Sequence, residues 1–165
     1  MLSPVTSRLI VAGSLRRGKT EVGDVEILYV PKFETRTEDM FSTRRVDIAG
    51  ECLDAMLTRG DISKRPSVRG TFAWGAQNKL ALHRSGVPVD FFATTEEKWW
   101  VSLVIRTGGL AMNMELTTGA QRLGRSLNAY GSGVTCSDGT VIQATSEEHV
   151  FELCGVKYRP PEVRP

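Results

Sequence analysis

Residues 13–26 read GSLRRGKTEVGDVE, and this stretch connects two apolar segments. The segment before it, residues 8–12 (RLIVA), and the segment that it enters, residues 24–30 (DVEILYV), both have the composition of short strands. Glycines in a loop let the backbone approach a phosphate, whose oxygens accept hydrogen bonds from backbone N–H groups. Ser14 and Arg17 add side-chain donors to the same loop. The stretch therefore predicts a strand–loop–strand unit that binds an anion.

Two acidic residues lie at the start of the second strand. Asp24 and Glu26 are separated by one residue, so both side chains point to the same face of a strand. Neighbouring carboxylates on an otherwise apolar strand repel each other and lose solvation, and a divalent cation would relieve both effects. The alternative is a strand end at which both acids simply face water. The pair alone does not distinguish the two interpretations.

A third carboxylate lies on a later apolar strand. Asp90 is the only charged residue of residues 87–93 (VPVDFFA). It is either the outward acid of an exposed edge strand or the third member of a cluster with the first pair. Three carboxylates on adjacent strands can hold a pair of Mg²⁺ ions, or Mn²⁺ in their place. Such a pair stabilises the attacking and leaving oxygens of a phosphoryl transfer.

The loop and the acids occur together in the signature of a known family. The stretch GSLRRGKTEVGDVE resembles the signature of the DNA polymerase β superfamily, and the double arginine and the Gly23–Asp24 junction point to family X. The resemblance continues along the chain, in order, in the segments VDFF (89–92), IRTGG (105–109), RLGRSLNAYG (122–131) and FELCGVKYRPPEVR (151–164). It covers nearly the whole chain.

The resemblance implies a role for each matched residue. Asp24 and Glu26 would ligate both metal ions, and Asp90 would ligate the catalytic ion and help to deprotonate the primer 3′-hydroxyl. Taken alone, residues 107–109 would be an ordinary turn between helices. The implied nucleotide-binding residues hold the phosphates, shape the ribose pocket or contact the base: Gly13, Ser14, Arg17, Gly23, Arg106, Thr107, Gly108 and Asn113.

Four positions depart from the family pattern. Glu26 replaces the commoner aspartate, which keeps the charge but lengthens the side chain. Arg106 stands where an aromatic residue is usual near the sugar, so the motif leaves the choice between dNTP and NTP open. Thr117 replaces an arginine that touches the template strand in the best-known members, and Pro88 replaces a basic residue. Both changes weaken the expectation of tight template handling.

Basic residues concentrate in residues 58–84, where Asp61 is the only acid. The formal net charge of the chain is only +2, so any contact with a polyanion must come from local patches. Considered alone, such a run is more often a solvated loop. Together with the resemblance, it and two arginines further on predict DNA-binding residues: Arg59, Lys64, Arg65, Arg69, Arg84, Arg122 and Arg125.

We expect an α+β fold of the polymerase β-like nucleotidyltransferase type. Residues 1–94 would form the catalytic palm with a mixed sheet, and residues 95–165 a nucleotide-selecting C-terminal lobe of helices and a few strands. The apolar patterns and capping residues predict helices at 47–59, 96–105 and 110–123, and a last helix whose capping box is Thr145 and Glu148. Further strands are expected at 71–74 and 79–83, whereas residues 32–46 and 61–70 are expected to be irregular.

Composition excludes several classes of protein. Three cysteines without a CxxC pair argue against a disulfide framework or a zinc site, and two histidines are too few for a multi-histidine metal site. The sequence contains no secretory signal and no apolar run long enough to cross a membrane, so we expect a cytoplasmic monomer. Because the chain begins seven residues before its first expected strand, we also expect no N-terminal lyase or helix-hairpin-helix module.

The expected activity is that of a magnesium-dependent DNA polymerase. It would add a dNMP to a primer 3′-hydroxyl in short gaps, as DNA repair requires, and release pyrophosphate. A second possibility keeps the metal site but uses another acceptor, such as RNA, a protein hydroxyl or a small molecule. A third is a non-catalytic nucleic-acid-binding module, against which the presence of all three carboxylates speaks.

Overall fold

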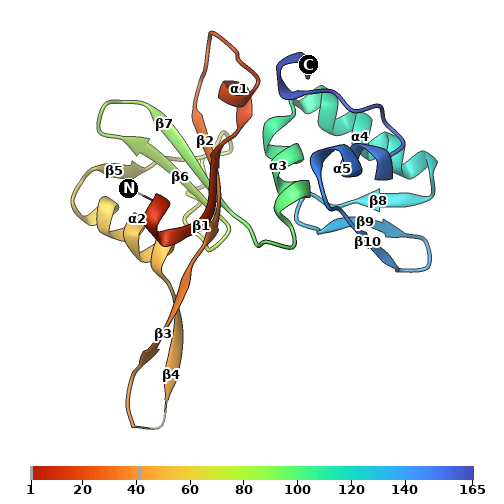
Figure 1. The fold of residues 1–165 in the computed structure, drawn as a ribbon. Coiled ribbons are helices and arrows are strands. Elements are labelled where there is room, and N and C mark those ends of the chain that lie inside the picture. The colour runs from red at the N-terminus through yellow and green to blue at the C-terminus, as the bar shows by residue number, and fades with distance from the viewer. Residues whose placement is uncertain (1, 41) are drawn as a thin grey trace.

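The computed structural model describes residues 2–40 and 42–165, and its largest element is a five-stranded sheet (Figure 1). Strands β2 and β7 are parallel neighbours, and the other neighbouring strands of this sheet are antiparallel. The strands, in the spatial order β1–β2–β7–β6–β5, are β1 (Thr6–Val11), β2 (Val25–Pro31), β7 (Pro88–Ala93), β6 (Asn78–His83) and β5 (Ile62–Lys64). Because parallel strands begin at the same edge, the first residues of β2 and β7 lie side by side.

The central strands bury apolar side chains on both faces of the sheet. Tyr29 of β2 packs with Leu53 of helix α2 (Ile48–Thr58) on one face. Leu28 packs with Phe92 of β7 on the other face. Helix α2 begins at Asp47, whose side chain accepts a hydrogen bond from the backbone N–H of Gly50 at 2.8 Å.

A two-stranded hairpin projects from the sheet and extends away from the rest of the molecule (Figure 1). Its strands, β3 (Phe33–Thr37) and β4 (Thr43–Asp47), pair with each other and form a separate sheet. Every residue of β3 is exposed. The cross-strand backbone ladder and ion pairs, such as Arg44 with Glu38 at 3.1 Å, hold the hairpin together.

The C-terminal part has its own core. Helices α3 (Trp99–Thr107), α4 (Leu110–Arg122) and α5 (Glu147–Leu153) pack with a three-stranded sheet of order β10–β9–β8. The fully buried Val104, Leu116 and Phe151 lie at the centre of this core. The remaining elements are β8 (Arg125–Leu127), β9 (Gly133–Cys136), β10 (Val141–Gln143), α1 (Gly13–Arg16) and the 3-10 turns η1 (Ser3–Val5) and η2 (Pro161–Val163).

Helix α3 joins the two parts. Its residues Trp99 and Leu103 pack against Leu28 and Val30 of β2, while Val104 belongs to the C-terminal core. Figure 1 shows α3 between the large sheet and the other helices. A group at the start of β2 therefore lies close to the turn that follows α3.

The expected α+β fold with a mixed sheet is confirmed, and several local predictions are wrong. Residues 32–46 contain the hairpin, and residues 61–70 contain β5. Residues 71–74 form only isolated bridges, Pro66 with Phe72 and Trp74 with Lys79. The last helix is capped by Ser146, one residue after the expected Thr145. No helix in the described residues is long and apolar enough to cross a bilayer.

Candidate active site

Three carboxylates gather where β2 and β7 begin. Asp24 directly precedes β2, Glu26 is its second residue, and Asp90 is the third residue of β7. Glu26 and Asp90 are direct partners in the parallel register, so their side chains leave the same face of the sheet. The Asp24 side chain is 38% exposed and the Asp90 side chain only 9%. The fold thus places the third acid on the strand next to the first pair.

Burial and mutual repulsion disfavour the charged forms of these acids. Burial raises the pKa of Glu26 to about 7, with Asp24 and Asp90 adding to the rise and Arg106 and Arg17 opposing it. Burial also raises the pKa of Asp90, and the adjacent Arg65 offsets only part of that rise. The cluster therefore favours positive charge close to its oxygens.

Arg65 supplies a positive charge inside the cluster. Its Nη2 donates to both carboxylate oxygens of Asp90, at 2.7 and 2.8 Å, and lies 3.8 Å from Oδ2 of Asp24. Only 23% of the Arg65 side chain is exposed. Sequence analysis placed this residue among the DNA contacts, whereas the structure places its guanidinium on the carboxylates.

The donor set suits a hard divalent cation, although the acids do not converge into a ready metal cage. All three side chains offer only carboxylate oxygens, the ligand type that Mg²⁺ and Mn²⁺ prefer. In the described part of the chain, no three His, Cys, Asp or Glu side chains are gathered closely enough to hold a metal ion. Asp90 is engaged by Arg65 instead. The chemistry of Asp24, Glu26 and Asp90 thus fits the ion, and the Arg65 guanidinium engages one of these carboxylates.

The glycine-serine loop packs directly against the acids. Gly13, the first residue of α1, has φ +62°, and a Cβ at this position would collide with the carboxylate of Glu26. Only glycine meets both conditions without strain. Ser14 follows on α1 and is half-buried, while Gly23 is exposed beside Asp24. The predicted anion-binding residues thus border the carboxylate cluster.

Arg17 connects this loop to the C-terminal part. Its Nη1 donates to the backbone carbonyl of Thr107 at 2.5 Å. Its buried Nε has no hydrogen-bond partner among the described residues. The guanidinium therefore has a donor left for an anion, although its other end is engaged by the turn after α3.

A buried ionic network reinforces the same connection. Arg16 donates from Nη1 to Glu147 Oε1 at 2.9 Å and to the hydroxyl of Thr107 at 2.7 Å, and its Nη2 pairs with Oε2 of Glu147. Arg164, whose side chain is completely buried, donates to Glu147 Oε1 at 3.0 Å and to the carbonyl of Arg159 at 2.8 Å. This network fixes α1 against α5 and the end of the chain. No local sequence pattern indicates it, because residues that bond directly in it are up to 131 positions apart.

The turn after α3 contains the predicted sugar and base contacts. Thr107 and Gly108 are buried, and Asn113 of α4 donates from Nδ2 to the carbonyl of Ile105 at 2.9 Å. The Asn113 Oδ1 atom is buried and has no partner among the described residues. Asn113 also lines an open hollow of about 380 Å³ with Leu110, Met114, Thr117 and Thr118. Asn113 thus caps α3 and borders a cavity at once.

Arg106 lies between the two parts of the molecule. Its guanidinium stacks on the ring of Phe92 at 3.6 Å from the centroid, and its Nη2 lies 3.4 Å from the hydroxyl of Tyr130. Its charge also lowers the pKa of Glu26 and of Asp90. An arginine at this position thus faces the carboxylates from the C-terminal side. The resemblance implied nucleotide binding for Arg106, and the sequence also marked it as a departure from the family pattern.

The other predicted DNA contacts are scattered over the surface. Arg59 pairs with Asp61 at 3.0 Å, and Arg84 lies 3.8 Å from the same acid. Lys64 lies over the ring of Trp74, and Arg125 donates to the carbonyl of Leu153 at 2.9 Å. Two further residues are exposed, Arg69 and Arg122.

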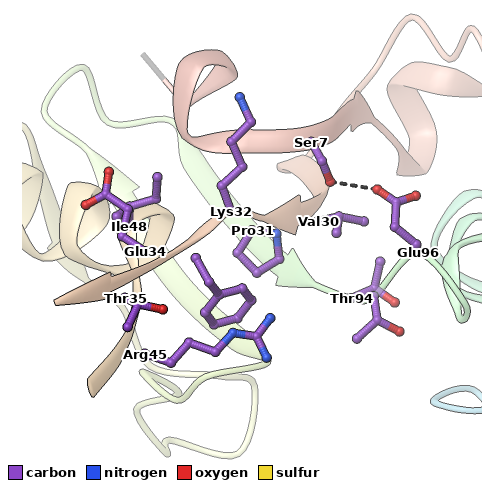
Figure 2. A pocket seen from close by; sticks show the side chains of 12 residues that line it. Ser7, Val30, Pro31, Lys32, Glu34, Thr35, Arg45, Ile48, Thr94 and Glu96 are labelled. Carbon is purple, nitrogen blue, oxygen red and sulfur yellow. Dashed lines mark hydrogen bonds between the residues drawn. The ribbon is translucent and has the colours of Figure 1, made fainter. Parts of the chain in front are cut away.

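A separate cavity lies away from the acids. It has a volume of about 640 Å³ and lies at the base of the hairpin (Figure 2). Its wall includes Pro31, the last residue of β2, and Thr94, which follows β7. Both lie at the ends of these strands opposite to the carboxylates. Arg45 covers the ring of Phe33 at 4.0 Å on one side. Because it contains none of the acids, we do not assign it to the active site.

Comparison with known proteins gives similarity over both parts of the chain. Residues 102–165 match the family model described as DNA polymerase beta thumb. The chain is also 25% identical to DNA polymerase lambda of Rattus norvegicus over 168 residues, which is 94% of this chain and 28% of that protein. The chain therefore spans less than a third of the length of this relative. The first match starts within α3, and the second extends over the carboxylate cluster as well.

Proposed function

On the premise that this chain is DNA polymerase β-like (family X), we propose that it transfers a nucleotidyl group from a dNTP to the 3′-hydroxyl of a primer in gapped DNA. The observation that carries the proposal is the adjacency of Glu26 and Asp90 on parallel strands, with Asp24 just before them and the Gly13 loop against Glu26. A non-catalytic binding module would have no use for buried acids that repel one another.

We propose that residues 1–94 are the catalytic palm and residues 95–165 the nucleotide-selecting lobe. The separate core of the C-terminal helices supports this division, as does the position of α3 between the two parts. The nucleotide would lie between the α1 loop and the turn after α3, because Arg17 already spans that gap. We expect the protein to act as a monomer in short-gap repair synthesis.

Asp24, Glu26 and Asp90 would hold Mg²⁺ or Mn²⁺. When bound, the ions supply positive charge that stabilises the attacking and leaving oxygens. Ser14, the free donor of Arg17 and the backbone of the loop up to Gly23 would orient the β- and γ-phosphates.

The transfer itself is an in-line displacement. The primer 3′-oxygen attacks the α-phosphorus, the bond from that phosphorus to the bridging oxygen breaks, and pyrophosphate leaves with the bonding electrons. The hydroxyl proton passes to a carboxylate oxygen of Asp90 and from there to water.

On the C-terminal side, Thr107 and Gly108 would shape the ribose pocket, and Asn113 would contact the base or sugar through its unpartnered Oδ1. Arg106 would lie close to the sugar as well. DNA phosphates would be bound by basic residues around the site: Arg59, Lys64, Arg69, Arg84, Arg122 and Arg125. Binding would then weaken steeply with salt.

Primer extension on one-nucleotide-gapped DNA tests this function. Each dNTP is supplied separately with Mg²⁺, and wild type is compared with Asp90→Asn. Extension by the complementary dNTP alone, lost in the variant, is the expected result. Extension by every dNTP would indicate an untemplated transferase. Binding of dNTP and Mg²⁺ without extension would favour another acceptor, such as RNA or a small molecule.

A further inference from the structure

The guanidinium of Arg65 lies among the carboxylates, where a bound divalent ion would also lie. A single nitrogen, Nη2, lies within hydrogen-bond distance of both oxygens of Asp90, at 2.7 and 2.8 Å, and 3.8 Å from Asp24 Oδ2. One positive centre thus contacts two of the residues assigned to metal binding.

The backbone holds Arg65 firmly while its side chain remains free to exchange. The residue follows the edge strand β5, and its N–H donates to the carbonyl of Leu80 at 3.1 Å. Its Nη1 has only a long contact of 3.4 Å, to the carbonyl of Pro66. Its buried Nε has no partner among the described residues. The pair with Asp90 therefore provides nearly all the side chain's hydrogen bonding, and a competing cation could replace it there.

The positive charge of Arg65 offsets the repulsion among the carboxylates of the cluster. Without a divalent cation, the acids repel one another in a partly buried site, and two acids on adjacent strands are in direct register. Arg17 and Arg106 act on the cluster only through longer-range attraction. Arg65 is the cation in direct contact with it. Adding divalent ions beside a retained guanidinium would place like charges next to one another.

We propose that Arg65 is a placeholder cation, which holds Asp90 in the metal-free protein and must leave that carboxylate when a divalent ion binds. This inference rests on the proposed function, because it takes Asp24 and Asp90 as metal ligands. Its consequence is that Arg65 stabilises the metal-free fold and lowers the affinity for metal. Once released, the guanidinium is free to bind a phosphate of the nucleic acid.

Direct Mn²⁺ binding, measured by calorimetry on the full chain without nucleotide or DNA, tests the proposal. The variants are Arg65→Met, which keeps the length and removes the charge, and Arg65→Lys, which keeps the charge on a single nitrogen. Arg44→Met is the matched control, since Arg44 is an exposed arginine of the projecting hairpin and its neighbour is Glu38, outside the cluster. Asp90→Asn tests the site itself. Thermal unfolding in EDTA and in Mn²⁺ gives a second readout.

Arg65→Met is expected to bind Mn²⁺ at least about tenfold more tightly than wild type, because a positive charge within about 4 Å of the ligand is gone. The melting temperature of this variant in EDTA should be lower than that of wild type. Mn²⁺ should raise the melting temperature of the variant by more than it raises that of wild type. The Mn²⁺ affinity of Arg65→Lys should lie between those of wild type and Arg65→Met. If Arg65→Met does not fold, the affinity of Arg65→Lys tests the proposal. Arg44→Met should match wild type in its Mn²⁺ affinity.

The possible failures are distinguishable. Equal or weaker Mn²⁺ binding by Arg65→Met and Arg65→Lys, with binding still lost in Asp90→Asn, would overturn the placeholder role and leave the proposed function intact. Mn²⁺ binding that is absent from every variant, or unchanged in Asp90→Asn, would overturn the proposed function and the placeholder role with it.

Discussion

Replacing Glu147 with glutamine should strongly destabilise the protein. The Glu147 carboxylate pairs with Arg16 and with Arg164, and the exposed fractions of these three side chains are 9%, 18% and 0%. Without that charge, Arg164 would lose its ion pair. It would keep the hydrogen bond to the carbonyl of Arg159 and its contacts with the rings of Phe151 and Tyr158. Breaking a buried ion pair on one side costs about 3–5 kcal/mol. For a chain of this size, such a loss lowers the melting temperature by about 6–20 °C.

Urea and thermal denaturation at neutral pH measure this effect. The matched control is Glu148→Gln, since Glu148 is the next residue of the same helix turn and is exposed. It should change the unfolding free energy by less than about 0.5 kcal/mol. An unfolding free energy of Glu147→Gln within about 1 kcal/mol of this control would mean that the network contributes no more than a surface ion pair. The proposed role of the network in joining the two parts would then be wrong.

The stability of wild type and of Glu147→Gln should also respond differently to acid. Burial raises the pKa of Glu147, but hydrogen bonds and charge from Arg16 and Arg164 lower it more, so the pKa lies below its ordinary value of 4.5. A carboxylate whose pKa is lower in the folded state contributes its stability above the unfolded pKa and loses it as the pH falls through the folded pKa. The difference in unfolding free energy between wild type and Glu147→Gln should therefore stay constant above pH 4.5 and shrink below it.

Three further predictions concern the site. Gly13→Ala should cost about 1–2 kcal/mol for its left-handed backbone and also abolish activity, because its Cβ meets a carboxylate of the cluster. Gly139→Ala, with φ +85° and open space in the turn between β9 and β10, should cost similar stability and keep activity. Arg106→Leu should lose the stack on Phe92, lowering the unfolding free energy by about 0.5–2 kcal/mol in urea titrations. Arg69→Ala should weaken binding to every gapped DNA sequence alike and reduce the slope of log affinity against log salt by about 1, and an unchanged slope would remove this residue from the DNA contacts.

The acids of the site could be predicted because their signal is local. Asp24 and Glu26 are two residues apart on a strand, which fixes their common face. Asp90 interrupts an apolar run, and an apolar run of this kind is a strand in the core of a sheet. The register that pairs Glu26 with Asp90 follows from the parallel arrangement, which the sequence does not state.

Other features could not be predicted, because they depend on distant partners or lack an apolar pattern. The hairpin of β3 and β4 is almost entirely exposed, so no alternation of apolar residues marks it. Glu147 is an ordinary acid in the first turn of a helix until the fold brings Arg16 to it. Arg65 belongs to a basic run that resembles a solvated loop, and only the position of β5 beside β6 brings it to Asp90.

The most direct test of the account is a single-turnover reaction on one-nucleotide-gapped DNA, with incorporated dNMP and released pyrophosphate measured together. Wild type is compared with Asp24→Asn, which removes the most exposed acid of the cluster, and with Glu97→Gln, an exposed acid outside it. We predict equal amounts of both products from wild type and Glu97→Gln, and a rate lower by more than about 100-fold in Asp24→Asn, since even outer-shell partners of a metal ligand contribute about 10–100-fold. Equal rates in all three proteins, or dNTP turnover without a lengthened primer, would contradict the assignment of this cluster as a nucleotidyl-transfer site.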